Sequence, residues 1–176
     1  MKKVMLLTIF AALMMISSAA VAQTASGTLT VTATVNGSIN LVFNSDASGV
    51  ALSSGAGTNA ATLAFGNVSA FGPISAGIVR STTATTFTVS SAVDVLVSKT
   101  NSASANYTLK AQLGAADAVN TWTVGGIAVS NAAQSTLTAT GTYAANSNFP
   151  VAITVPFTTA SGTLISNTIN YVATAN

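Results

Sequence analysis

The chain has 176 residues, of which 49% are hydrophobic but only 5% are charged, and it contains neither histidine nor cysteine. This composition excludes a Ser–His or Cys–His nucleophile and a zinc site built on histidine or cysteine. Glutamate is missing as well, so the acid–base chemistry of an enzyme would depend on a few scattered aspartates. We therefore expect a protein that is not an enzyme and that uses no metal and no cofactor.

The N-terminus has the three-part pattern of a secretory signal peptide. A basic start at residues 1–3 precedes an apolar run at 4–16, and Ala20 and Ala22 then form an A-x-A frame. We predict a signal peptide over 1–22, cleaved after Ala22. The alternative is an uncleaved anchor, which the short apolar run disfavours. The mature protein is expected to pass through the periplasm to the cell surface or the extracellular space, with no stable membrane insertion after cleavage.

Removal of the signal leaves one predicted domain, residues 23–176, whose formal charges balance. The charged residues that remain are Arg80, Lys99, Lys110, Asp46, Asp94 and Asp117. They form no basic patch, so we expect no nucleic-acid partner. A neutral surface rich in threonine does little to oppose self-association, which favours a protein that assembles over an ordinary secreted domain.

Apolar and polar residues alternate with a period of two through most of this domain. In 27–35 and 106–113 every second residue is apolar, which is typical of half-buried strands. Clusters of Gly, Ser, Asn and Pro separate such runs, and no segment has a helical period, so the sequence predicts an all-β sandwich or barrel. The predicted strands are 27–35, 38–43, 61–67, 74–80, 84–90, 92–99, 106–113, 121–124, 127–130, 135–142, 150–157 and 164–173.

An aspartate in a loop and the aromatic residues could each have a binding function, but we predict a structural role for both. Asp46 follows Asn44 and Ser45 in a loop, where an Asx-turn is favoured over a weak calcium ligand. Most aromatic residues lie on the alternating apolar stripes, so we predict core positions for them rather than a sugar-binding platform. These aromatic residues are Phe65, Phe71, Phe87, Tyr107, Trp122, Phe149, Phe157 and Tyr171.

Three stretches of the chain resemble the secreted pilin-like β-sandwiches of the spore coat U family and the archaic chaperone–usher pilins. They are the N-terminal strands at 27–35 and 38–43, the Leu-x-Phe-Gly-Asn-Val motif within 62–68, and the C-terminal strand at 161–173. The motif is also similar to one in an uncharacterised family of secreted proteins. Many pilin-like members carry a cysteine near the position where this chain has Ser38.

The resemblance implies an immunoglobulin-like antiparallel β-sandwich that lacks its last strand and is completed by a donor strand. It implies a structural subunit of a pilus- or fimbria-like surface fibre that serves adhesion or biofilm formation. The implied partners are copies of the chain or related subunits, a periplasmic chaperone and an outer-membrane usher. The donor strand would be 27–35, and its inserted side chains would be Leu29, Val31, Ala33 and Val35.

A competing interpretation keeps this strand within its own chain. Asn36-Gly37 is a strong signal for a two-residue hairpin, which would pair 27–35 with 38–43. In that case the protein would be a self-contained secreted or surface β-sandwich with a binding or coat role.

Overall fold

The computed structural model describes residues 26–176, and these contain eleven strands and no helix. All of the strands belong to the compact unit Val35–Asn176. The strands are β1 (Ser38–Ser45), β2 (Val79–Thr82), β3 (Thr86–Ser91), β4 (Val93–Thr100), β5 (Tyr107–Leu113), β6 (Thr121–Val124), β7 (Ile127–Val129), β8 (Ser135–Gly141), β9 (Asn146–Asn148), β10 (Val151–Pro156) and β11 (Ile169–Ala175).

One layer is built around two long, interrupted strands. β3 and β4 follow one another with only Ala92 between them, and β9 and β10 are separated by Phe149 and Pro150. β10 pairs with β3 and β9 pairs with β4 in one continuous antiparallel register, and the Phe149 N–H donates to the Val93 carbonyl at 2.8 Å across the interruption. β1 and β2 pair with the outer edges of β4 and β3, while β6 and β7 follow β10 on the other side.

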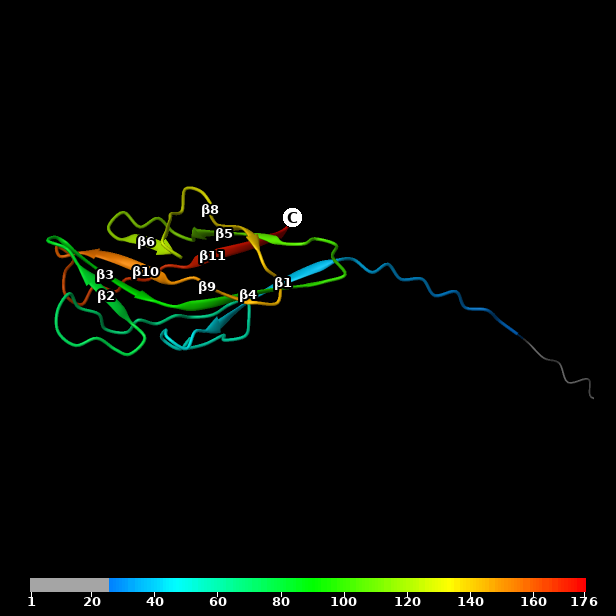
Figure 1. The fold of residues 1–176 in the computed structure, drawn as a ribbon, viewed down its shortest axis with the longest axis horizontal. Helices are drawn as coiled ribbons and strands as arrows, with labels where there is room; N and C mark the ends of the chain where they lie inside the picture. The colour runs from blue at the N-terminus through cyan, green and yellow to red at the C-terminus, as the bar shows by residue number, and fades with distance from the viewer. Residues whose placement is uncertain (1–25) are drawn as a thin grey trace, which may run out of the picture. The chain divides into compact units, whose positions relative to one another are not determined.

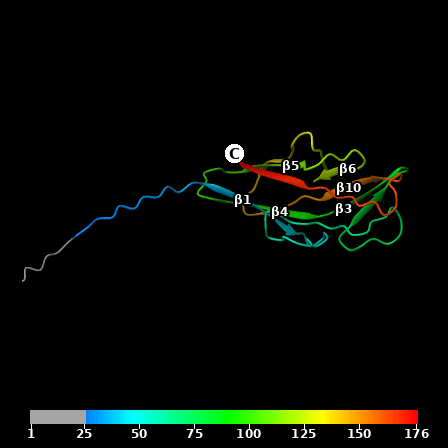
Figure 2. The same ribbon diagram turned by 180° about the vertical axis from the view of Figure 1, so that it is seen from behind.

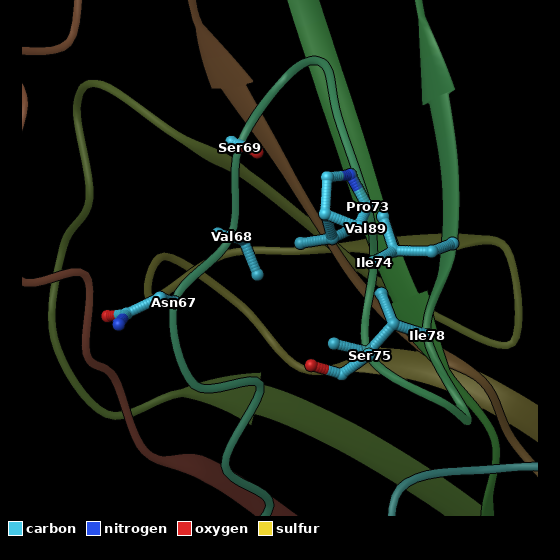
Figure 3. Close-up of a pocket in the computed structure, with 8 residues that line it drawn as sticks. All are labelled: Asn67, Val68, Ser69, Pro73, Ile74, Ser75, Ile78 and Val89. Carbon is cyan, nitrogen blue, oxygen red and sulfur yellow. The ribbon is translucent and has the colours of Figure 1, made fainter.

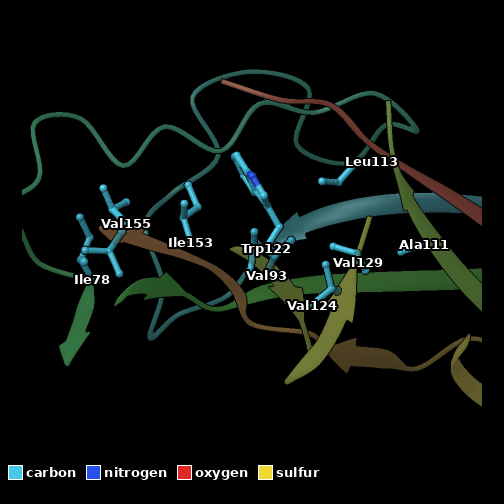
Figure 4. Packing of buried hydrophobic residues seen from close by; sticks show 11 residues of the cluster. Ile78, Val93, Ala111, Leu113, Trp122, Val124, Val129, Ile153 and Val155 are labelled. Carbon is cyan, nitrogen blue, oxygen red and sulfur yellow. The ribbon is translucent and has the colours of Figure 1, made fainter. Parts of the chain in front are cut away.

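The second layer is the three-stranded antiparallel sheet β11-β5-β8. Figures 1 and 2 show β11 and β5 side by side along one side of the unit, apart from β3 and β4. Buried side chains from both layers pack between them, as the close-up in Figure 4 shows. The all-β sandwich predicted from the sequence is therefore confirmed for the described residues.

The alternating pattern also identifies which side chains face this core. Every second residue of β4 and β5 is buried, from Val93 to Val97 and from Tyr107 to Leu113, and the residues between are partly exposed. Thr88 and Thr154, opposite one another on β3 and β10, instead share a hydrogen bond of 2.7 Å between their hydroxyls. β-Branched residues therefore occur on both the core-facing and the outward faces of the strands, as valine and threonine respectively.

Several strand predictions were wrong. Residues 61–67 form no strand: they make only an isolated bridge between Ser54 and Thr62, although Leu63 and Phe65 do pack on the core. The segment predicted at 74–80 becomes a strand only from Val79, and β9 was not predicted at all. The alternation in 61–67 therefore indicates an extended segment with one buried face. It does not indicate that a neighbouring strand is hydrogen-bonded to this segment.

Residues 26–37 form no strand in this structure, so neither the strand predicted at 27–35 nor its hairpin with 38–43 is present. β1 pairs with β4 instead, from Ser38 opposite Thr100 to Ser45 opposite Val93. The predicted signal peptide over 1–22 lies outside the described residues. No helix in the described part of the chain is long and apolar enough to cross a membrane.

Candidate functional site

β11 is the last strand of the chain and has a backbone partner on one side only among the described residues. It pairs with β5 over its whole length, from Ile169 opposite Leu113 to Ala175 opposite Tyr107. Its second edge carries no ladder, because β11 stands at the end of the sheet order β11-β5-β8. A free edge of this kind is a template on which another strand can add.

The side chains of β11 that face the core are less buried than their partners on β5. Leu109 and Ala111 have no exposed surface and Leu113 is 4% exposed. The β11 residues opposite them remain partly exposed, and they are Ala173, Tyr171 and Ile169. The sheet therefore closes over the core at β5 but leaves it partly open at β11.

β1 shows the same contrast at the edge of the other layer. Leu41 and Phe43 are partly exposed, while Val97 and Val95, their partners on β4, are fully buried. We use the term open edge for the free side of β11 together with the partly exposed apolar side chains beside it. These side chains are Leu41, Phe43, Ile169, Tyr171 and Ala173.

An aromatic contact links the two strands of the open edge. The rings of Phe43 and Tyr171 meet edge to face, with centroids 5.0 Å apart and planes at 70°. Burial raises the pKa of the Tyr171 hydroxyl above its ordinary value, so this residue stays uncharged throughout the physiological range. The open edge is consequently apolar and electrically neutral.

The four residues predicted for the donor strand are exposed in the structure. The exposed fraction is 88% for Leu29, 81% for Val31 and 73% for Val35, and Ala33 is exposed as well. Exposed apolar side chains point to an interaction site only where several of them gather in one patch. The sequence identified this segment, whereas it missed the open edge of β11.

Gly37 has a different role from the hairpin turn that its sequence suggested. A Cβ atom at this position would lie 2.6 Å from the carbonyl oxygen of Asn101 in the loop between β4 and β5. Only a glycine permits this close approach of two backbones without a shift. Gly37 therefore fixes the point at which the chain enters β1.

Each of the three aspartates accepts hydrogen bonds from neighbouring groups. The Asp46 Oδ1 atom accepts the Ser48 N–H at 2.7 Å, which confirms the predicted Asx-turn. Hydrogen bonds lower the pKa of this carboxyl, those from the Ser48 hydroxyl and N–H first. Asn148 donates to both Asp46 and Asp94, so the two carboxylates share a neutral amide between them. No group of three or more His, Cys, Asp or Glu side chains suited to a metal occurs in residues 26–176.

Asp117 organises a turn and holds a core residue. Its carboxylate accepts the Asn120 N–H at 2.9 Å and the Trp122 Nε1–H at 2.8 Å. Partial burial raises the pKa of Asp117, but these hydrogen bonds and one from the Val119 N–H outweigh it and lower the pKa to about 2. Trp122 is only 5% exposed, which confirms that it is a core residue. Phe71 and Phe157, by contrast, are 72% and 39% exposed, and both were wrongly placed in the core.

Two hollows lie in the described part of the chain, and neither is lined by a titratable side chain. The smaller one in Figure 3, between the 67–75 loop and Ile78 and Val89, has a volume of about 10 Å³. This space admits a single water molecule at most. A second, open depression near the start of β11 has a volume of about 490 Å³ and is lined by exposed or partly exposed polar and small residues.

Comparison with protein-family models, curated proteins and solved structures gave no match to this chain.

Proposed function

We propose that the mature chain is a structural subunit of a bacterial cell-surface fibre of the pilus or fimbria kind. Residues 27–35 of one subunit add to the free edge of β11 in the next and complete its sheet. The observation that carries this proposal is the partial exposure of Ile169, Tyr171 and Ala173 beside the fully closed β5. An added strand would cover these side chains and would use the free backbone groups of β11.

The exposed N-terminal segment supports the same assembly. Its apolar side chains alternate at Leu29, Val31, Ala33 and Val35, as an inserted strand requires. In this proposal the domain is an immunoglobulin-like sandwich that lacks one strand, which would lie beside β11, since β11 is at the edge of its sheet among the described residues. The missing strand is supplied by another subunit.

The proposal includes a route to the cell surface. The signal peptide over 1–22 exports the chain, a periplasmic chaperone covers the open edge in transit, and an outer-membrane usher releases the growing polymer. Head-to-tail contacts of this kind do not close on themselves, so they produce a filament that serves adhesion or biofilm formation. N-terminal sequencing of exported protein is expected to begin at Gln23, and a mature chain that keeps Met1 would contradict the export step.

The experiment that tests strand donation is the change Val31→Asp in the mature chain. A charge buried against apolar side chains without a partner is strongly unfavourable, so polymers seen by electron microscopy are expected to disappear. Circular dichroism of the isolated subunit is expected to remain unchanged, because Val31 is exposed before assembly. The matched control is Thr30→Asp, whose side chain would face away from the core and which is expected to polymerise.

Two results would overturn this proposal. If the Val31→Asp variant forms as many polymers as the wild type in electron microscopy, the segment is not inserted into a neighbouring subunit. Unfolding of the isolated variant would show that the segment belongs to the core of its own chain, which favours a self-contained secreted or surface β-sandwich with a binding or coat role.

A further inference from the structure

Asn36 and Gly37 form the single Asn-Gly pair in the sequence, and they lie where the chain enters the sandwich. We propose that Asn36 is a site of spontaneous covalent modification, at which the Gly37 backbone nitrogen attacks the Asn36 side chain and converts it to aspartate and isoaspartate. The reaction needs only the chain and water, so it is independent of the proposed function.

The first step of the reaction forms one bond and breaks another. The Gly37 nitrogen gives its proton to hydroxide and bonds to Cγ of Asn36, which closes a five-membered cyclic imide. The bond from Cγ to Nδ2 breaks, and this nitrogen takes up a proton from water and leaves as ammonia. Water then opens the ring at either of its two carbonyl groups, which gives aspartate or isoaspartate. Neither step requires an oxidant or a metal.

A glycine after the asparagine favours this ring closure. The attacking nitrogen and Cγ belong to neighbouring residues, so the step is intramolecular and profits from their proximity. A side chain on the following residue would crowd the nitrogen and restrict the backbone. Gly37 has no Cβ atom and can adopt backbone conformations that other residues avoid, so it allows the approach that the ring requires.

The fold itself requires a glycine at this position. A Cβ atom on residue 37 would lie 2.6 Å from the Asn101 carbonyl oxygen, so a side chain here would force two backbone segments apart. Packing against Asn101 therefore keeps at position 37 the residue type that leaves Asn36 most reactive. The chemical lability of Asn36 is thus a consequence of how the chain enters β1.

The pair is accessible to solvent and lies outside the sheet. Both residues are exposed, and the pairing of β1 with β4 begins only at Ser38, opposite Thr100. Among residues 26–176 the Gly37 N–H has no backbone acceptor, whereas most N–H groups of paired strands are occupied by the ladder. Hydroxide can therefore reach the Gly37 N–H, and its nitrogen is available for the attack.

The other asparagines of the described residues lack this combination. Asn40 and Asn170 lie within β1 and β11, where pairing fixes the backbone. Seven others hold their side-chain amides in hydrogen bonds, and they are Asn44, Asn106, Asn120, Asn146, Asn148, Asn167 and Asn176. Four more are followed by a residue with a side chain, and they are Asn59, Asn67, Asn101 and Asn131. We therefore expect Asn36 to react at least tenfold faster than any other asparagine.

Conversion changes both the charge and the backbone length at the start of β1. Residues 26–37 contain no charged side chain, so the carboxylate of the product is the first charge in this segment. In isoaspartate the main chain runs through Cβ of residue 36, which adds one atom to the backbone directly before Gly37. Aged chains consequently differ from new ones at the joint between the exposed segment and the sandwich.

Incubation of the mature chain at pH 8 and 37 °C tests this proposal. Peptide mass spectrometry follows the replacement of the amide by an acid at residue 36, and a methyltransferase specific for isoaspartate labels the second product. We expect Asn36 to be lost at a rate within threefold of that in a synthetic peptide of residues 32–39, because the fold does not shield it. Asn36→Gln is the matched control and is expected to remain unchanged, since its longer side chain must close a less favourable six-membered ring.

Three results would overturn the proposal. An Asn36 that stays intact while the free peptide is converted would show that the folded chain protects it. Equal or faster conversion at another asparagine, or equal labelling of the Asn36→Gln variant, would remove the assignment to residue 36. Circular dichroism before and after the incubation is expected to be the same, and conversion confined to chains that have unfolded would contradict a reaction in the native protein.

Discussion

Phe43 of β1 and Tyr171 of β11 pack edge to face across the two layers, with ring centroids 5.0 Å apart. Both residues belong to strands at the margin of a sheet, and both are less buried than the strand residues paired with them. This arrangement is one of the favoured geometries for aromatic pairs. The contact links β1 to Tyr171, the third residue of β11.

The first prediction concerns the strength of this contact. Phe43→Ala is expected to lower the free energy of unfolding by about 1–3 kcal/mol, less than the ~3–5 kcal/mol of a fully buried phenylalanine, because Phe43 is only partly buried. Urea unfolding followed by circular dichroism measures the change. Tyr171→Phe keeps the ring and is expected to change stability by less than about 0.5 kcal/mol. An equal loss in both variants would show that the ring contact is not the cause.

The second prediction concerns Asp117 and acid. Its pKa is lowered from 3.8 to about 2 in the folded protein, so its carboxylate stabilises the fold above pH 4, and this contribution is lost as the pH falls towards 2. Solvent screening limits the effect to about 1 kcal/mol. Asp117→Asn is expected to lose this amount at pH 7 and to differ less from the wild type at pH 2.5, as measured by urea unfolding at both pH values.

Asp46 also has a lowered pKa, so the wild type and the Asp117→Asn variant should share the acid sensitivity that Asp46 contributes. The informative quantity is therefore the difference between the two proteins at each pH. A difference that does not shrink between pH 4 and pH 2.5 would mean that the carboxylate charge of Asp117 does not stabilise the fold.

The third prediction concerns the entry of the chain into β1. Gly37→Ala places a Cβ atom against the Asn101 carbonyl and is expected to cost about 1–3 kcal/mol, because two backbones must separate. Gly27→Ala is the matched control, since nothing lies within 4 Å of a Cβ atom there. Thermal unfolding of the two variants side by side measures the difference. Equal melting temperatures would mean that β1 starts without the close approach to Asn101.

Sequence periodicity was sufficient to predict the central strands. Each of these strands has a neighbouring strand on both sides, so its alternating apolar residues do coincide with a hydrogen-bonded strand. β4, β5 and β10 alternate in sequence and are buried at every second residue, as predicted. The same alternation failed at 61–67, where Leu63 and Phe65 reach the core from an extended segment without a ladder. A period of two specifies which face is apolar, and it carries no information on whether a neighbouring backbone is present.

The candidate site could be predicted only in part, for the same reason. The alternation of residues 27–35 is visible in the sequence, whereas the proposed acceptor edge depends on the absence of a neighbouring strand beside β11. In sequence, Tyr171 and Ala173 resemble Leu109 and Ala111, although the former are partly exposed and the latter are not. Position within the sheet, which arises from long-range pairing, separates the two cases.

The last prediction concerns the conditions under which the polymers form. Neither residues 26–37 nor β11 contains a charged side chain, and Tyr171 is uncharged over this pH range, since burial raises a pKa that is already high. Salt screens only interactions between charges, and in the proposed assembly the association of the two strands depends instead on apolar burial and backbone hydrogen bonds. We expect the rate of polymerisation of the mature chain, measured by light scattering, to change less than threefold between 50 mM and 500 mM NaCl and between pH 5.5 and 8.5. An assembly driven by charged surfaces would slow or accelerate markedly over the same range. A tenfold change would therefore place the contact between subunits away from β11 and residues 27–35.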